Sequence, residues 1–148
     1  MPPRPFRESP ERQDQRIRKH VAQAKEYWAK GAEHLREEDT CQAAEKGWGT
    51  VAQITKAVAT LKGWNHYDHV AIRDCVYELA EENPSQGPEI IRGMRAAEHL
   101  HGQFYEVYMT LRTVELALED VVPLLEVLWG FLPEEYTGGG TFSQQAPA

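Results

Sequence analysis

The sequence predicts an all-α protein, an up-and-down bundle of four long helices and one short helix. Three observations support this fold class. Apolar residues recur every three or four positions over five segments of the chain, which is the spacing of one helix face. Capping residues such as Asp and Gly stand at several ends of these segments. No segment of useful length alternates apolar and polar residues as a β-strand does.

The chain of 148 residues suits one domain of average size, and 41% of its residues are hydrophobic. We expect a flexible Pro-rich tail over residues 1–10, where four of the nine prolines fall. A single helical domain is expected over residues 11–133. Residues 134–148 show no apolar period and are expected to form a disordered tail.

The first two long helices should form an antiparallel hairpin. The first is expected from about Glu11 to Arg36. The second begins near Thr40, because Asp39 and Gln42 form a capping-box pattern, and it ends before the C-cap Gly63. Only three residues separate the two helices, which is typical of antiparallel neighbours.

A short third helix is expected after Asp68, ending in the turn-rich stretch 83–87. Pro88 is placed for the first turn of the fourth helix. The residues expected on one apolar face of that helix are Ile91, Met94, Ala97, His101, Phe104, Tyr105 and Tyr108.

The last long helix is expected from about Thr113 to Leu132. Its second half is apolar nearly all round, which is more than one face of a monomer needs, so the pattern favours docking of a partner protein or of a second copy in a homodimer. Pro123 should kink this helix or split it in two, because an interior proline removes a backbone hydrogen bond.

Charge and cysteine content exclude several classes of protein. Sixteen Lys and Arg against 23 Asp and Glu give a net charge of −7, which argues against a non-specific nucleic-acid binder but leaves room for a local basic site.

Cys41 and Cys75 fit neither a disulfide framework nor a zinc ribbon, so reduced thiols and a cytoplasmic location are expected. The sequence shows no signal peptide and no apolar run of membrane-spanning length, so no membrane partner is expected.

The fourth helix carries the residues best suited to catalysis. His101 lies in its apolar stripe, Tyr105 follows one turn later, and Arg95 precedes the histidine by six positions. Such a set suits metal-independent attack of a ribose 2′-OH on the adjacent RNA phosphate, with histidine as acid or base, arginine holding the phosphate and tyrosine orienting it. The alternative is a core histidine, a packing aromatic and a solvated arginine.

Two other histidine sets are open to a functional interpretation. Arg92 and His99 align on a polar stripe with Gln103 and Glu106, and they are candidates for substrate binding, although such a stripe is usually a solvated face. Residues 66–69 read His-Tyr-Asp-His, which is typical of a helix cap more than of a metal site. We therefore expect neither a metal nor a cofactor, and no Gly-rich phosphate loop or Ser or Cys nucleophile is recognisable.

Three segments give the chain a family resemblance: QAAEKGWGTVAQITKAV, GWNHYDH and AAEHLHGQFYE. Over roughly residues 18–130 the sequence resembles the HEPN superfamily, in particular its prokaryotic PaREP-type branch. The resemblance implies a small helical bundle that usually dimerises. It also implies that Arg95 and His101 match the Arg-x4-6-His motif of metal-independent ribonucleases, with Tyr105 at the position of a tyrosine sometimes found after the histidine.

The resemblance also implies classes of partner and of function. Some HEPN proteins are toxins beside a nucleotidyltransferase-type antitoxin, while others bind nucleotides or serve as interaction modules. The sequence therefore predicts a HEPN-like domain that binds RNA or a nucleotide, with metal-independent RNA cleavage as the candidate activity. The alternatives left open are a non-catalytic dimerisation or protein-interaction module and a metal-dependent enzyme using His66 and His69.

Overall fold

The computed structural model describes residues 2–105 and 107–147, without the side chains of Phe104 and Tyr105. The described chain is a packed bundle of helices, and it contains no strand beyond one isolated bridge between Pro5 and Trp64. The all-α prediction is therefore confirmed. The helices are α1 (Pro10–Arg36), α2 (Thr40–Lys62), α3 (His69–Glu82), α4 (Gly87–Tyr105), α5 (Leu111–Gly130), α6 (Glu134–Thr137) and α7 (Phe142–Gln145).

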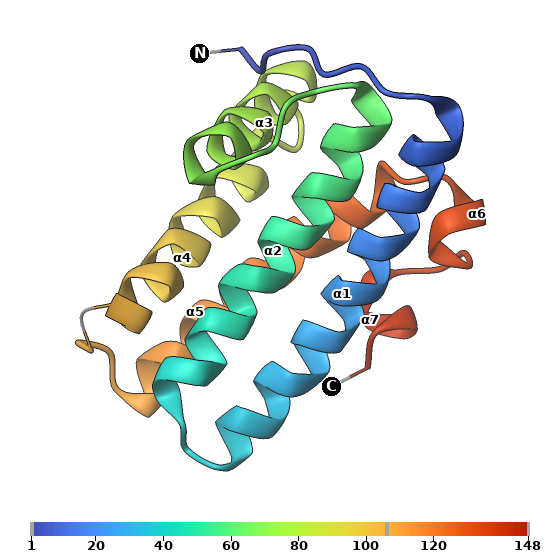
Figure 1. Ribbon diagram of the computed structural model, residues 1–148. Helices are drawn as coiled ribbons and strands as arrows, with labels where there is room; N and C mark the ends of the chain where they lie inside the picture. The colour runs from blue at the N-terminus through green and yellow to red at the C-terminus, as the bar shows by residue number, and fades with distance from the viewer. Residues whose placement is uncertain (1, 106, 148) are drawn as a thin grey trace.

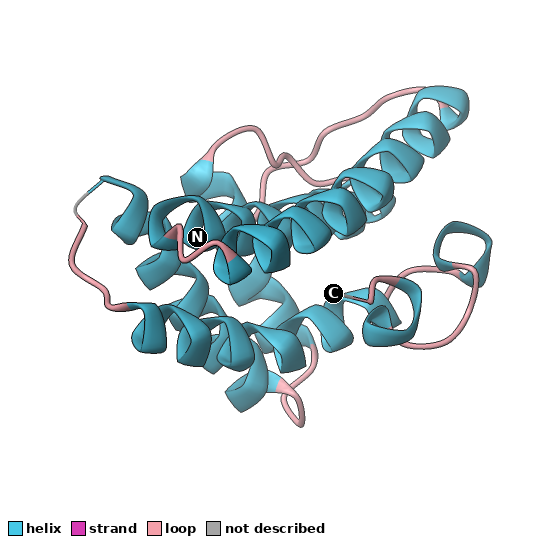
Figure 2. Cartoon of the chain, turned by 90° about the horizontal axis from the view of Figure 1, so that it is seen from below, coloured by secondary structure: helices cyan, strands magenta, loops and turns pink. Residues whose placement is uncertain are grey.

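Helix α2 occupies the centre of the bundle. It forms a hairpin with α1, and it also packs against α3, α4 and α5, while α4 and α5 pack against each other (Figure 1). Figure 2 shows the same helices and the loops that join them from below. Because α2 has neighbours on most sides, nearly all of its second half is buried.

Local signals in the sequence set several helix ends. The Asp39 side chain accepts a hydrogen bond from the Gln42 backbone N–H at 3.1 Å, and Asp68 accepts one from Ala71 at 2.8 Å. Gly63 ends α2 in the left-handed region, with φ of 73°. The predicted caps Asp39 and Gly63 are confirmed. The full capping box is not formed, because the Asp39 backbone N–H donates to the His34 carbonyl at 2.9 Å rather than to the Gln42 side chain.

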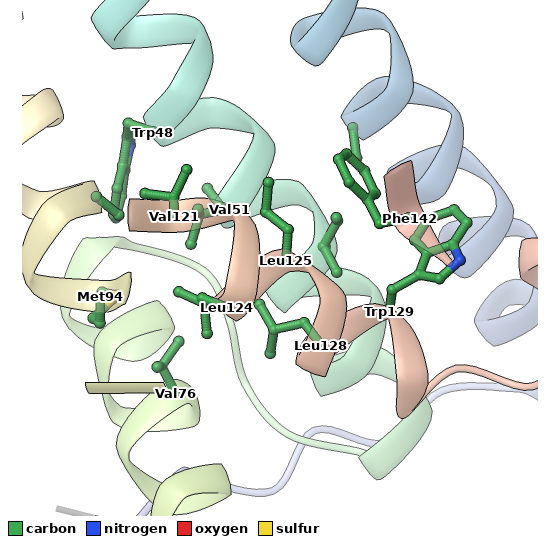
Figure 3. Packing of buried hydrophobic residues seen from close by; sticks show 14 of the residues in the cluster. Trp48, Val51, Val76, Met94, Val121, Leu124, Leu125, Leu128, Trp129 and Phe142 are labelled. Carbon is green, nitrogen blue, oxygen red and sulfur yellow. The ribbon is translucent and has the colours of Figure 1, made fainter. Parts of the chain in front are cut away.

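Helix α5 supplies much of the core (Figure 3). Its buried side chains are Val114, Ala117, Val121, Leu124, Leu125, Val127, Leu128 and Trp129. Pro123 is exposed, and α5 runs through it as one helix, so the predicted split does not occur. The proline lies on the solvent side of α5. There the loss of its backbone hydrogen bond costs least stability, because water can bond the carbonyl that is left without a donor.

The C-terminal segment differs most from the expectation. Instead of a disordered tail, residues 134–147 include α6 and α7, and the Phe142 side chain is buried. Its ring meets Trp28 and Trp129 edge-on, with centroid distances of 5.8 and 5.4 Å. The Gly138–Gly140 run forms the turn before α7, with positive φ at all three glycines.

This segment also explains the apolar excess on α5. Trp129 is covered by Phe142 of the same chain, and Val127 and Leu128 are buried without a second copy. The observation that led us to expect a homodimer is thus accounted for within one chain. The set of four long helices and one short helix was incomplete, because it lacked α6 and α7.

The N-terminal tail is likewise held against the bundle. The Phe6 backbone N–H donates to the Gly63 carbonyl at 2.7 Å, and the Asn65 N–H donates to the Arg4 carbonyl at 2.6 Å.

None of the helices in the described part of the chain combines the length and the apolar character that a membrane span requires.

Candidate functional site

His101 lies on the side of α4 that faces α2. The fully buried side chains of α4 are Ile90, Met94, Ala97, Leu100 and Gln103. The face of α4 that packs into the core is therefore rotated slightly about the helix axis from the apolar face predicted from the sequence. The His101 side chain keeps 23% of its surface exposed, and its Nδ1 lies 3.5 Å from Oε2 of Glu45 on α2. His101 is thus a half-buried histidine with a carboxylate partner rather than a core histidine.

His69 is brought beside His101 by the packing of α3 on α4. Asp68 caps α3, which makes His69 the first residue of the helix, and its Nε2 lies 3.4 Å from Oε1 of Glu98 on α4. The ring centroids of His69 and His101 are 5.0 Å apart. Both rings also pack on Trp48, at 4.6 and 4.8 Å. We call His69 and His101 the histidine pair.

The histidine pair opens into a surface groove of about 310 Å³ along α2, here called the α2 groove. Its walls come from Tyr27 of α1, the outer face of α2, residues 67–69 and His101. Lys56 is a cation in the lining, and burial and the nearby charge of Lys19 lower the pKa of its ammonium group. The groove therefore combines two imidazoles, carboxylates and one lysine, which is a set suited to proton transfer.

Arg95 does not reach this site within one chain. Its side chain is exposed and lines a different hollow between α3 and α4, with Tyr77 and Glu81. Six helical steps separate it from His101 by about 120° around the axis. The side chain of Tyr105, the third predicted catalytic residue, lies outside the described residues.

The predicted substrate-binding residues Arg92 and His99 are both exposed, and neither lines the α2 groove. The His99 carbonyl accepts a hydrogen bond from the Tyr108 hydroxyl at 2.7 Å. Gln103 was placed on the same solvated stripe, which is wrong: it is fully buried, and its Oε1 accepts the backbone N–H groups of Tyr108 and Met109. Gln103 therefore fixes the loop after α4. Glu106 lies outside the described residues.

His66 makes its ring contacts with other residues than His69 does. Its Nδ1 donates to the Trp64 carbonyl at 3.0 Å, and its ring lies 5.7 Å from that of His20. His20 in turn bonds through Nδ1 to Oε1 of Gln53, at 2.7 Å. His20, Gln53 and His66, all buried, are called the closed cluster.

The closed cluster is held in the neutral form. Burial lowers the pKa of His20 to about 4, although the hydrogen bond that its ring donates to Gln53 works in the opposite direction. Burial also lowers the pKa of His66. The Nδ1–H of His20 donates to the amide oxygen of Gln53. The other ring nitrogen, Nε2, is buried and has no hydrogen-bond partner among the described residues.

His66 and His69 do not share one cluster, and neither cysteine takes part in a disulfide. No group of three or more His, Cys, Asp or Glu side chains in the described part of the chain could hold a metal ion. Cys41 and Cys75 are free thiols. Burial, followed by the charge of Asp74, raises the pKa of Cys75 to about 12, which suppresses the nucleophilic thiolate.

Sequence reasoning missed His69 as the neighbour of His101. The sequence places it in the first turn of a helix, where histidine is commonly a surface or capping residue. Only the packing of α3 against α4 brings the two rings together.

Comparison with known proteins identifies a family. The sequence model of the archaeal PaREP1/PaREP8 family matches residues 19–125, which include α2, α3, α4 and the histidine pair. No curated protein and no solved structure matches the chain.

Proposed function

The chain belongs to the archaeal PaREP1/PaREP8 family, and from that premise we propose that it is a HEPN-like domain that binds RNA or a nucleotide in the α2 groove. We further propose that it cleaves RNA without a metal, with His69 and His101 as the acid and base. The observation that carries this proposal is the contact of two partly exposed histidines, each beside a carboxylate, in one open groove.

Two adjacent histidines suit both proton transfers of RNA cleavage. One imidazole takes the proton of the ribose 2′-OH, whose oxygen then attacks the phosphorus. The other, as imidazolium, gives its proton to the leaving 5′-oxygen, and a 2′,3′-cyclic phosphate remains. Glu45 and Glu98 would orient the rings, as a carboxylate does for a catalytic histidine.

The charges around the pair define how a phosphate would bind. Glu45, Asp68 and Glu98 disfavour an anion, whereas Lys56 and a protonated imidazole favour one. Arg95 would contribute only from a second copy, so the proposal needs no Arg95 from the same chain.

The test is RNA cleavage in EDTA by the wild type, His101→Ala and His69→Ala, with circular dichroism to match their folding. Each of these variants should lose about 10²- to 10⁴-fold in rate, the usual contribution of a general acid or base. His99→Ala is the matched control, because His99 lies on the same helix but outside the groove, and it should retain activity.

Arg95→Ala separates this site from the Arg-x5-His motif. If the histidine pair acts within one chain, this variant should cleave at nearly the wild-type rate. A loss as large as that of His101→Ala would instead place Arg95 at the reacting phosphate, in a site shared by two copies. Cleavage that survives in both histidine variants would overturn the proposal.

A non-catalytic interaction module is the second candidate. An apolar surface groove between α1 and α5 favours it. Under this alternative neither histidine variant changes function, and the partners to seek are a second copy of the chain and a nucleotidyltransferase-type antitoxin. Light scattering of the purified protein tests the predicted homodimer.

A further inference from the structure

The apolar groove between α1 and α5 has room for one large side chain. Trp28 and Leu35 line it from α1, Leu118 and Val122 line it from α5, and Gly47 of α2 also borders it. Its volume is about 200 Å³, smaller than the roughly 300–1,000 Å³ of pockets for drug-sized ligands. We call it the α1–α5 groove.

The chain itself fills the neighbouring part of the same surface. Phe142 of α7 packs against Trp28 and Trp129. Trp28 thus contacts Phe142 and also borders the α1–α5 groove. The filled part shows which chemistry this surface accepts, namely an aromatic side chain at the start of a short helix.

A carboxylate of α5 receives the start of α7. Oε1 of Glu126 accepts the Phe142 backbone N–H at 2.6 Å, and Oε2 accepts both the N–H and the hydroxyl of Ser143, at 3.2 and 2.6 Å. A negative side chain beside the free N–H groups of a helix start is favourable both as a hydrogen-bond acceptor and through the helix dipole.

The α1–α5 groove repeats this arrangement two helical turns earlier. Glu119 lies seven residues before Glu126, so both carboxylates lie on nearly the same face of α5, and Glu119 lines the groove. Glu119 therefore offers a carboxylate acceptor beside an apolar hollow.

We propose that the α1–α5 groove binds the first turn of a short helix from a partner protein. An aromatic or large aliphatic side chain of that turn enters between Trp28 and Leu118, and Glu119 accepts the free backbone N–H groups, as Glu126 does for α7. This surface is separate from the histidine pair, so the proposal does not depend on RNA cleavage.

The probe is a synthetic peptide with the sequence of residues 139–148, GGTFSQQAPA, which contains the α7 motif. The full chain, labelled with ¹⁵N, is titrated with this peptide and followed by NMR. The signals of the Trp28 indole, Leu118 and Val122 should shift and saturate. Affinity should be weak, with Kd on the order of millimolar, because one side chain and a few hydrogen bonds carry it.

Two changes should weaken binding and one should not. Glu119→Gln in the protein, and replacement of the phenylalanine of the peptide by alanine, should each raise Kd at least about fivefold. Asp120→Asn is the matched control, since Asp120 is the exposed neighbour of Glu119 and does not line the groove. It should bind like the wild type.

Three results would overturn the proposal. The first is no shift at Trp28, Leu118 or Val122 at millimolar peptide. The second is a set of shifts confined to Trp129 and Glu126, which would mean that the peptide exchanges with α7. The third is equal binding by Glu119→Gln and the wild type.

Discussion

The histidine pair and the closed cluster are neighbours with opposite environments. Gln53 belongs to the closed cluster and also lines the α2 groove. In the pair, each imidazole has a carboxylate within 3.5 Å and remains partly exposed. In the closed cluster, the partners of the rings are an amide and a backbone carbonyl, and the rings are buried.

The surrounding charges reinforce this difference. Burial lowers the pKa of both His20 and His66, and the positive charge of Lys56 lowers both further. A histidine in such a place is kept neutral and serves packing. The comparison shows that burial and partner type, rather than the presence of histidine, separate a candidate catalytic group from a structural one.

The largest expected effect in this comparison is a pH-dependent loss of stability caused by His20. Its pKa is lowered from 6.5 to about 4, so between these values the unfolded chain binds more protons than the folded one. Stability should therefore fall as pH drops from about 6.5 to about 4, by about 3 kcal/mol for His20. Urea unfolding at a series of pH values measures this loss.

The control for that experiment is His20→Gln, which keeps an N–H donor for Gln53 but cannot titrate. Its stability should decline less steeply over the same range, with the remaining slope due to His66 and to carboxyl groups. Equal slopes for the variant and the wild type would contradict the assignment of His20 as a neutral buried group.

A smaller effect is expected when the closed cluster loses its hydrogen bond. Gln53→Leu leaves the buried Nδ1–H of His20 without its acceptor and should cost about 1–3 kcal/mol of unfolding free energy. Gln42→Leu is a suitable control, because Gln42 lies in the first turn of the same helix and is only partly buried. If the two variants unfold at the same urea concentration, the hydrogen bond adds nothing to stability.

The smallest effect on stability should come from the histidine pair. Glu45→Gln removes a carboxylate that is 30% exposed and paired with His101, and it should change the unfolding free energy by less than about 1 kcal/mol. Under the proposed function the same variant should slow RNA cleavage. A stability loss larger than that of Gln53→Leu would show instead that Glu45 and His101 hold the bundle together.

The helices were predictable because their signals are local. Asp39, Gly63 and Asp68 act on backbone groups within a few residues, so their spacing in the sequence suffices. Position within a helix face was less predictable. Gln103 looks solvated from periodicity alone, but it turns inward because the next loop needs an acceptor for two backbone N–H groups.

The site and the C-terminal segment required the tertiary structure. The contact of His69 with His101 depends on how α3 packs on α4, which no spacing encodes. The family motif grouped Arg95 with His101, but the fold exposes Arg95 elsewhere. One signal was present and unused: Thr141 and Gln144 form a capping box in the segment that composition marked as disordered.

The attachment of α7 to its own chain has a thermodynamic consequence for any competitor. Because Gly138–Gly140 join it to α6 as a short linker, its docking is intramolecular, and short flexible linkers give effective concentrations on the order of millimolar. A free ligand of similar chemistry must overcome that local concentration to displace Phe142. The linker therefore keeps the surface around Trp129 occupied by α7 of the same chain. The adjacent α1–α5 groove is the part of this surface that a separate ligand can bind without competing with α7.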